Sequence, residues 1–394
     1  MRLLLLSFYY PPDLSAGSFR ARALAEALAA QIEPGGSIDV ITTAPNRYSS
    51  FTEAAVAVET AGPLTIRRIP LPAHRSDTLG QSRAFAHFAW TAGRCTARVP
   101  YDVVIATSSR LMTAALGAHI AGRGGARLYL DIRDIFVDTI GDVFPRLSWV
   151  LRAPLSALER WTVRRADRIN LVSRGFESYF DSRYPDRSYS WFTNGIDEEF
   201  VAARWSHRAA RDPREPLHVV YAGNIGEGQG LHAILPALAQ RAGGRLRFSV
   251  IGDGGRRELL LRSLREAGVG SVELLPPLSR PALIEAYAGA DILFLHLNAH
   301  AAFEKVLPSK IFEYAATGKP IWAGVAGHAA RFIREEVANA AVFVPCDAAD
   351  ALLQLESLRL CHEPRAAFTA RYARGSIAAA MARDVLRLAR NPAP

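Results

Sequence analysis

The stretch LHVVYAGNIGEGQGL, residues 217–231, decides the fold. Its apolar start at 217–221 predicts a buried strand, and a helical pattern begins at Leu231. The glycines between them allow a diphosphate to approach backbone N–H groups at the positive end of a helix. The stretch does not match G-x-G-x-x-G, and the chain has no G-x-x-x-x-G-K-[ST], which argues against a dinucleotide site and a P-loop. The alternative is a flexible turn that binds nothing.

The same alternation of short apolar runs and helical patterns continues on both sides, as is typical of parallel strands with crossover helices. Two such series follow each other, so the sequence predicts an α/β fold with two parallel-sheet domains. Helices are expected between the strands, for example at 19–30 and 154–166. The predicted strands are 3–8, 38–42, 65–69, 103–106, 128–132 and 168–172, then 217–221, 246–251, 272–275, 292–296, 321–323 and 341–344.

The expected organisation is a first domain over residues 1–201, a linker over 202–216 and a second domain over 217–363. The linker is rich in Arg and Pro. A helical tail over 364–394 is expected to cross back to the first domain. Doubly wound sheets bind ligands beyond the carboxyl ends of their strands, so we expect the site in a cleft between the domains.

Composition excludes several classes of protein. With 394 residues, 49% of them hydrophobic and 22% charged, the chain is globular rather than disordered or fibrous. Its three cysteines are far apart, which argues against a zinc site or a disulfide framework and suits a cytoplasmic protein. The opening MRLLLLSFYYPP is interpreted as a first strand rather than a signal peptide. No stretch is long enough to span a membrane, so any membrane contact would be peripheral, on the inner face of the cytoplasmic membrane.

The net charge of +9 predicts an anionic partner. Nucleic acid is not expected, because the basic residues are spread along the chain without an RNP, zinc-finger or basic-zipper pattern. A phosphorylated ligand or an anionic membrane surface explains the charge equally well. The chain has only three lysines, Lys305, Lys310 and Lys319, and all fall in one segment. Either this segment needs the compact point charge of lysine rather than the planar guanidinium of arginine, or the three lysines cluster there by chance.

The segment FEKVLPSKIFEYAATGKP, residues 303–320, is the most informative. Pro308 suits the first turn of a helix and Gly318 its C-terminal cap, which predicts a short helix. Lys310 at its N-terminus would hold phosphates, and Glu313 could bind vicinal hydroxyls such as those of a ribose. The alternative is a capped surface helix with solvated charges. A second glycine turn, Gly-Asp-Gly at 252–254, could bind a ligand through Asp253 or only reverse the chain.

These motifs together resemble bacterial retaining glycosyltransferases of family four. The resemblance is carried by PSKIFEYAATGKPI, YAGNIG…QGL, the GDG turn, FTNGID at 192–197 and SFYYPP…GSFRARALAEAL, in the family's order over most of the chain. It is closest to the branch that transfers N-acetylated amino sugars such as N-acetylfucosamine in surface-polysaccharide assembly, including O-antigen and capsule. It implies the GT-B fold, with two Rossmann-like domains. It also implies a UDP-sugar donor and a sugar acceptor that is polyprenyl-diphosphate-linked or otherwise membrane-associated.

The resemblance also implies site residues, carried over by position. Glu313 would bind the ribose, and Gly17 would approach the donor phosphate from the first domain. Asp131 would lie beside the reacting sugar, although it is equally suited to a structural role at a strand end. The implied catalytic residues are Asp131, Arg133, Asp134, Glu304 and Lys305. The implied donor-binding residues are Gly17, Gly223, Asn224, Gln229, Gly252, Asp253, Gly254, Leu307, Pro308, Ser309, Lys310 and Glu313.

The sequence departs from the family's pattern in three places. The Glu that the family places eight positions before Glu313 is Lys305 here, with Glu304 one position off register. The family's diphosphate-binding Arg and Lys align with Asn224 and Gln229. We hypothesise that Lys305 or Lys310 neutralises the diphosphate instead. No Asp-x-Asp occurs, so we expect transfer without a metal or other cofactor, with cationic groups stabilising the leaving diphosphate.

Two alternatives of function stay open at this point. A nucleotide-sugar epimerase shares the fold and would convert UDP-sugar without an acceptor. A non-catalytic binder would bind UDP without transfer. In addition, the stretches 83–98 and 144–168 combine aromatic residues with arginines, which suits a membrane interface or, alternatively, helices packed on a sheet.

Overall fold

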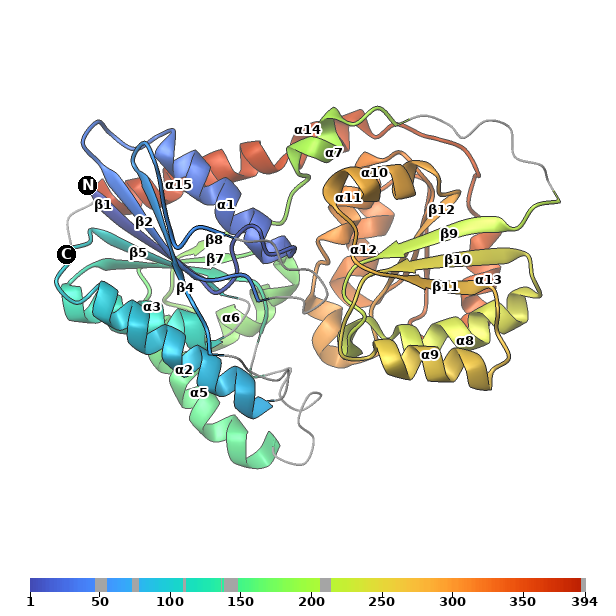
Figure 1. Ribbon diagram of the computed structural model, residues 1–394, viewed down its shortest axis with the longest axis horizontal. Coiled ribbons are helices and arrows are strands. Elements are labelled where there is room, and N and C mark those ends of the chain that lie inside the picture. The colour runs from blue at the N-terminus through green and yellow to red at the C-terminus, as the bar shows by residue number, and fades with distance from the viewer. Residues whose placement is uncertain are drawn as a thin grey trace. The chain divides into compact units, whose positions relative to one another are not determined.

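The computed structural model describes residues 1–46, 55–72, 78–108, 111–135, 137, 148–205 and 214–390. The chain forms two units (Figure 1). The first unit comprises Met1–Asn194 and Arg374–Pro394, and the second comprises Gly195–Ala373. Ile196 donates its N–H to Tyr372 O over 2.8 Å, so the segments that enter and leave the second unit lie side by side.

The second unit begins earlier and ends later than the sequence predicts. It begins at Gly195 rather than 217, because the short helix α7 (Glu198–Ala202) buries Phe200, which stacks on Tyr287 of this unit. Most of the expected linker, residues 206–213, lies outside the described residues. The expected single tail helix is two helices, α14 (Ala366–Arg371) and α15 (Arg374–Arg390), and only α15 belongs to the first unit.

The first unit is built on one mostly parallel sheet in the order β3-β4-β2-β1-β5-β6-β7-β8. Its strands are β1 (Arg2–Ser7), β2 (Ser37–Thr43), β3 (Val58–Ala61), β4 (Leu64–Ile69), β5 (Val103–Ser108), β6 (Arg127–Ile132), β7 (Arg168–Leu171) and β8 (Tyr189–Ser190). The apolar run of β1 is buried between β2 and β5. The sequence did not predict β3 or β8. All four residues of β3, with the sequence VETA, are exposed and form no apolar run, and β3 pairs antiparallel with β4 at the edge.

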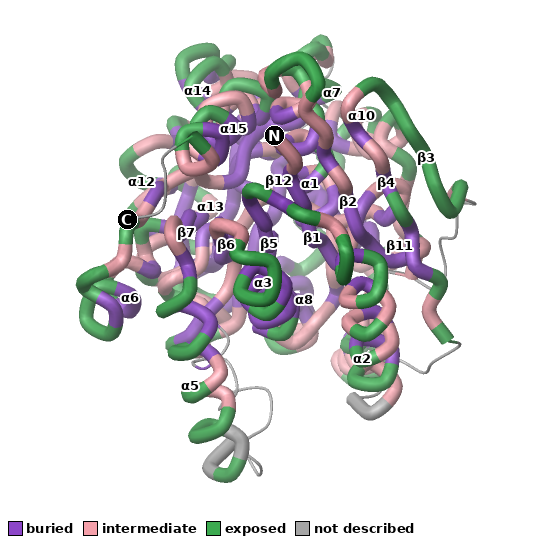
Figure 2. The backbone as a smooth tube through the Cα atoms, turned by 90° about the vertical axis from the view of Figure 1, so that its left-hand side faces the viewer, coloured by how far each residue is buried: buried purple, intermediate pink, exposed green. Residues whose placement is uncertain are grey.

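Helices cover both faces of this sheet (Figures 1 and 2). On one face lie α2 (Thr78–Cys95), α3 (Leu111–Gly124) and α5 (Ser148–Arg165). On the other lie α1 (Ala16–Ala29) and α15, where Met381 and Val385 join Leu24 and Leu28 in one core. The short elements η1 (Arg174–Phe176) and α6 (Glu177–Arg183) follow β7. Among the described residues, no helix has the length and apolar character needed to cross a membrane.

The second unit has a fully parallel six-stranded sheet in the order β11-β10-β9-β12-β13-β14. Its strands are β9 (Leu217–Ala222), β10 (Leu246–Ile251), β11 (Val272–Leu275), β12 (Ile292–His296), β13 (Ile321–Gly324) and β14 (Ala340–Phe343). Besides α7 and α14, its helices are η2 (Glu227–Gln229), α8 (Leu231–Ala242), α9 (Arg257–Glu266), α10 (Arg280–Ala288), η3 (Ala301–Lys305), α11 (Lys310–Ala316), α12 (Gly327–Glu336) and α13 (Ala348–Leu355). The strand order reverses between β9 and β12, and parallel sheets bind ligands at such a point, beyond the carboxyl ends of the strands.

Candidate functional site

The glycine turns after β9 and β10 pack directly against each other. Gly223 donates its N–H to Ile251 O over 2.8 Å, and a Cβ added to Gly252 would lie 1.9 Å from Gly223 O. Both residues have positive φ angles, 146° at Gly223 and 142° at Gly252, so side chains are excluded on two grounds. The contact between the two turns extends to the residues that follow. Ile225 donates its N–H to Asp253 O over 2.8 Å, and a Cβ added to Gly254 would lie 2.6 Å from Ile225 O. The two turns form one glycine-lined surface at the end of the sheet.

The Lys310 ammonium group lies against this surface. A Cβ added to Gly223 would lie 1.9 Å from Lys310 Nζ, and Nζ is 5.6 Å from the centre of the Tyr221 ring. Helix α11 is anchored here, because the buried Tyr314 hydroxyl accepts the Ala222 N–H over 3.1 Å. The structure thus brings together two predicted residues, Gly223 and Lys310, that are far apart in the sequence.

Asn224 and Gln229 bind each other. Asn224 Nδ2 donates to Gln229 Oε1 over 2.8 Å, and the same oxygen accepts the Gly226 N–H over 3.2 Å. The two side-chain amides therefore stabilise the turn after β9 through hydrogen bonds inside the turn itself. Where the resembled family places two cations, this chain has an uncharged pair, and Lys310 supplies positive charge to the same turn from α11.

His296, which no motif in the sequence contains, joins this turn to the loop after β14. His296 Nδ1 lies 2.7 Å from Gln229 O, and Nε2 accepts the Cys346 N–H over 2.9 Å. These partners assign the ring proton to Nδ1. Burial lowers the pKa of His296 to about 4, so the ring is neutral. The one signal in the sequence is a polar residue that ends an apolar strand.

The predicted site residues from Glu304 to Ser309, at the end of η3 and before α11, have different surroundings. Glu304 packs its backbone and Cβ against the start of α12, where a Cβ added to Gly327 would lie 2.2 Å from Glu304 O. Lys305 ends η3 and is partly buried. Leu307 is buried, whereas Pro308 and Ser309 are partly buried and precede α11, which begins at Lys310. Of the two lysines predicted to replace the missing cations, Lys310 contacts a glycine turn through its Nζ.

Lys319 is not part of this site. Its side chain is buried and its Nζ donates to Ala288 O and Ala290 O, each over 2.8 Å. The ammonium group satisfies backbone carbonyls at the end of α10 and just before β12. The clustering of the three lysines in the sequence therefore does not extend to their contacts.

Glu313, the predicted ribose-binding residue, faces Arg280. Glu313 Oε1 lies 3.6 Å from Arg280 Nη1, and the Glu313 side chain is 13% exposed. Arg280 also pairs with Asp197 at the start of α7 and lies 4.9 Å from the centre of the Phe200 ring. Arg280 therefore holds Glu313 in place, and no pattern in the sequence singled Arg280 out.

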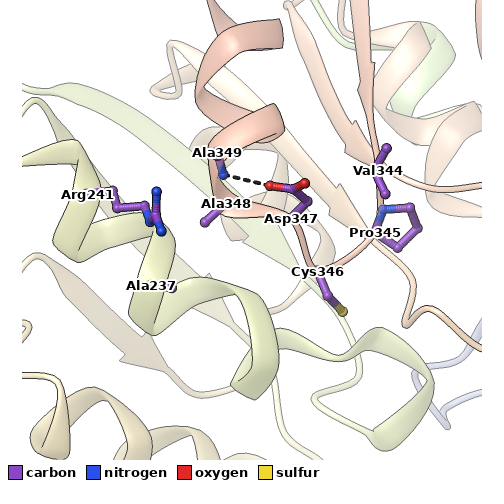
Figure 3. A pocket seen from close by; sticks show the side chains of 8 residues that line it. All are labelled: Ala237, Arg241, Val344, Pro345, Cys346, Asp347, Ala348 and Ala349. Atoms are coloured by element: carbon purple, nitrogen blue, oxygen red, sulfur yellow. Dashed lines mark hydrogen bonds between the residues drawn. The ribbon is translucent and has the colours of Figure 1, made fainter.

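A surface pocket lies between α8 and the loop after β14 (Figure 3). Asp347 caps α13 there by accepting the Ala349 and Asp350 N–H groups over 2.9 and 3.0 Å. None of the predicted site residues lines this pocket. Within the described part of the chain, no group of three His, Cys, Asp or Glu side chains is placed to hold a metal ion.

In the first unit, Asp131 is fully buried and saturated with hydrogen bonds. Arg20 donates to both carboxylate oxygens over 2.8 and 2.9 Å, Asn170 Nδ2 donates over 2.7 Å, and Thr107 Oγ1 over 3.0 Å. Burial alone would raise its pKa, but the charge of Arg20 and these hydrogen bonds hold the pKa below its usual range. Arg20 also donates to Phe192 O over 2.7 Å. These contacts give Asp131 a structural role inside the unit, and its place beside the reacting sugar stays a prediction.

Arg133 and Asp134 follow β6 and are partly buried, whereas Asp131 is fully buried. A Cβ added to Gly17, in the first turn of α1, would lie 2.0 Å from Arg133 Nη1, so the structure brings these two predicted residues together. Asp134 borders an apolar cavity lined by residues that include Leu111 and Phe180. Burial raises the pKa of Asp134 to about 6, against the opposing charge of Arg133.

Comparison with known proteins places both units in known families. The glycosyl transferase 4-like domain matches residues 17–189, and the glycosyl transferases group 1 domain matches residues 204–374. The putative colanic acid biosynthesis glycosyl transferase WcaI of Escherichia coli K12 is 26% identical over 343 residues, which cover 81% of this chain and 82% of that protein.

Solved structures show the same fold. Sucrose-phosphate synthase from Thermosynechococcus elongatus has a TM-score of 0.75 at 16% identity, over 98% of this chain and 99% of that one. HepE of Anabaena, in complex with UDP and glucose, has a TM-score of 0.66 at 14% identity, over 98% and 100%. The predicted GT-B fold is confirmed. The two domain matches follow in order and together span most of the sequence, so the chain has a glycosyl transferase 4-like domain followed by a glycosyl transferases group 1 domain.

Proposed function

We propose that the chain transfers an N-acetyl amino sugar from a UDP-sugar to a polyprenyl-diphosphate-linked or otherwise membrane-associated acceptor, with retention of configuration and without a metal ion. The proposed process is surface-polysaccharide biosynthesis, which the name of WcaI supports. The complex of HepE with UDP and glucose supports the nucleotide. The observation that carries the proposal is the contact of Lys310 with the paired glycine turns of the second unit.

The glycine surface and Lys310 would bind the donor diphosphate. Gly223 and Gly252 leave the backbone open to a ligand, and Lys310 Nζ lies against Gly223 with its positive charge. Negative charge develops on the diphosphate as its bond to the anomeric carbon breaks. A fixed cation at that place stabilises the transition state more than the ground state. Lys310 is therefore the proposed replacement for the two cations missing at Asn224 and Gln229.

Glu313 would bind the ribose hydroxyls through its carboxylate. Two vicinal hydroxyls can donate to the two oxygens of one carboxylate, and Arg280 at 3.6 Å keeps this side chain oriented. Arg280 is thus proposed as a positioning residue that does not touch the donor.

In the first unit, Arg133 and Asp134 are proposed to orient the acceptor and to stabilise charge at the reacting carbon. The new bond joins the acceptor oxygen to the anomeric carbon on the face that the diphosphate leaves, and the departing phosphate takes the acceptor proton. Gly17 gives this region room beside Arg133. Asp131, with all its hydrogen bonds inside the unit, positions the strand end that carries Arg133 and Asp134.

Calorimetric titration with UDP and with uridine tests the proposed role of Lys310. We expect Lys310→Met to weaken UDP binding about 10–100-fold, the value of one charge-assisted hydrogen bond, and to leave uridine binding unchanged. Lys305→Met is the matched control and should keep most of the UDP affinity. Equal UDP affinity in wild type and Lys310→Met would refute the assignment.

Product analysis separates transfer from the two alternatives. With UDP-N-acetyl amino sugar and a polyprenyl-diphosphate sugar, we expect a new glycoside whose anomeric configuration matches that of the donor, also in the presence of a metal chelator. Conversion of the UDP-sugar without acceptor would instead identify an epimerase. UDP binding without either reaction would identify a non-catalytic binder. This alternative is tested because Asn224 and Gln229 form an uncharged pair where the resembled family has two cations.

A further inference from the structure

The outer surface of α2, α3 and α5 carries exposed aromatic and aliphatic side chains. Trp90 is 60% exposed, Val150 48%, Met112 44% and Trp161 40%. They account for four of the large exposed hydrophobic residues in the described part of the chain, and all lie on one side of one sheet. Residues 144–147 of the predicted basic stretch lie outside the described residues.

Every exposed charged side chain on the described parts of these three helices is an arginine. The one carboxylate among them, Glu159 of α5, is buried and accepts the hydroxyl groups of Tyr179 and Tyr184 over 2.8 and 3.0 Å. Other helices differ. On α1, Arg22 pairs with Glu26 over 2.7 Å, and α9 carries Glu258 and Glu266 beside its arginines. The exposed charge on the described residues of these three helices is therefore positive.

The exposed tryptophans are paired with arginines. Arg94 lies 4.7 Å from the centre of the Trp90 ring, and Arg165 lies 5.6 Å from that of Trp161. Such a pair combines an amphipathic ring, suited to the headgroup region of a bilayer, with a guanidinium group that can bind a lipid phosphate.

The three helices form one layer, so their exposed sides share one direction. Helix α3 packs against both α2 and α5, and all three lie on the same side of the sheet in both views (Figures 1 and 2). On α2, Phe85 and Phe88 are buried against Phe8 of the sheet side. Trp90 follows Phe88 by two positions, which places it on the opposite side of the helix.

We infer that this arginine–tryptophan face, the exposed surface of α2, α3 and α5, docks the protein on an anionic lipid bilayer. Charge complementarity selects this partner, because the face has arginines and no exposed carboxylate on its described residues. Aromatic rings give interfacial burial that a soluble anion could not provide. The inference deepens the proposed function by naming the surface on which a lipid-linked acceptor would be met. Its test requires neither donor nor acceptor.

Vesicle flotation with the full chain tests the inference. The probes are vesicles of phosphatidylcholine alone and of phosphatidylcholine mixed with phosphatidylglycerol. We expect wild type to bind only the mixed vesicles and to be released by salt, which screens the attraction. Each arginine removed from the interface should weaken binding about fivefold. The variants are Arg94→Glu/Arg164→Glu and Trp90→Ala/Trp161→Ala.

The control is Arg262→Glu/Arg265→Glu on α9, which makes the same change of net charge on exposed residues of the second unit. It should bind like wild type, and thermal unfolding checks that every variant is folded. Binding that is lost equally in the control, or that is absent in wild type, overturns the inference. So does a concentration-dependent dimer that Trp90→Ala/Trp161→Ala abolishes, because the face would then bind a second copy. UDP titration of the same samples reports separately on the proposed function.

Discussion

Asp131 and Asp134 lie three positions apart at the end of β6, yet their surroundings shift their pKa values in opposite directions. Four hydrogen bonds and the charge of Arg20 lower the pKa of Asp131, whereas burial beside an apolar cavity raises that of Asp134 to about 6. At this scale a buried carboxyl group with a raised pKa is a candidate for function, because its ionisation destabilises the fold. A carboxyl group with all its partners supplied by the interior is a structural one.

Asp134→Asn should stabilise the first unit at pH 8 and lower the rate of transfer. In wild type, the raised pKa means that the stability contributed by the protonated group is fully present below pH 3.8 and is lost as the pH rises through about 6. At pH 8 the free energy of unfolding of Asp134→Asn should exceed that of wild type by on the order of 2–3 kcal/mol. Urea unfolding between pH 4 and pH 8 measures this change, and transfer assays should show that kcat/KM of wild type falls below about pH 6.

The same pH profile for Asp134→Asn and wild type would show that Asp134 does not titrate in this range. Asp186→Asn is the control, since Asp186 is exposed and belongs to the same unit. It should change neither the stability profile nor the rate.

The sequence pointed to residues of the candidate site where a local motif contains them, and not to residues whose contacts with the site arise only in the fold. Gly223 and Lys310 were predicted because a glycine turn and a helix start are local patterns. Arg280 could not be predicted, since its contact with Glu313 depends on the packing of α10 against α11. In the same way, nothing local distinguishes Lys319, which binds two carbonyls in the interior, from Lys310, which lies at the glycine surface.

At the scale of elements, the loops after β9, β12 and β14 are held together by one neutral imidazole. His296 ends β12, bonds to Gln229 O after β9, and accepts the N–H of Cys346 after β14. Protonation would leave Nε2 unable to accept, so the three loops depend on the neutral ring. This dependence links the shape of the glycine surface to pH.

His296→Leu should lower the stability of the second unit at pH 7 by about 2 kcal/mol, because two partly buried backbone groups, Gln229 O and the Cys346 N–H, lose their partner. It should also flatten the pH dependence. In wild type the pKa is lowered to about 4, so the stability contributed by the neutral ring is present above pH 6.5 and is lost as the pH falls through about 4. Urea unfolding at a series of pH values measures both effects. An unchanged slope below pH 6.5 relative to wild type would contradict this account, and the exposed His119 provides a control as His119→Leu.

Helices and strands were predictable where their buried side gives the sequence a regular pattern of apolar residues. Strands β10, β11 and β12 have the predicted bounds because apolar residues predominate in each, in the sequences LRFSVI, VELL and ILFLH. The exposed edge strand β3 has no such run and was missed. The tail was predicted as one helix because α14 and α15 are both helical in pattern. The break at Tyr372 and Ala373, where the chain changes units, depends on contacts of Tyr372 with Phe312 and Phe368 in the second unit.

At the scale of the whole molecule, each unit has a hydrophobic core of its own. The core of the first unit is completed by α15, from the far end of the chain, and Asp384 fixes this helix. Asp384 Oδ2 accepts the hydroxyl groups of Tyr129 over 3.1 Å and Ser190 over 2.5 Å. The core of the second unit is built from residues such as Phe248 and Trp322. Two separate cores predict two unfolding transitions rather than one.

UDP and the substitution Asp384→Ala should therefore shift different unfolding transitions. Asp384→Ala leaves the buried Tyr129 hydroxyl without this partner, so it should destabilise the first unit by about 2 kcal/mol and lower its midpoint by roughly 4–8 °C. UDP at a hundredfold excess over its Kd should stabilise the second unit by about 2.7 kcal/mol and raise its midpoint by roughly 5–10 °C. Differential scanning calorimetry at one scan rate measures both. A single transition that both changes shift equally would show that the two cores unfold together, whereas a UDP effect confined to the transition that Asp384→Ala lowers would place the nucleotide on the first unit and contradict the proposed role of Lys310.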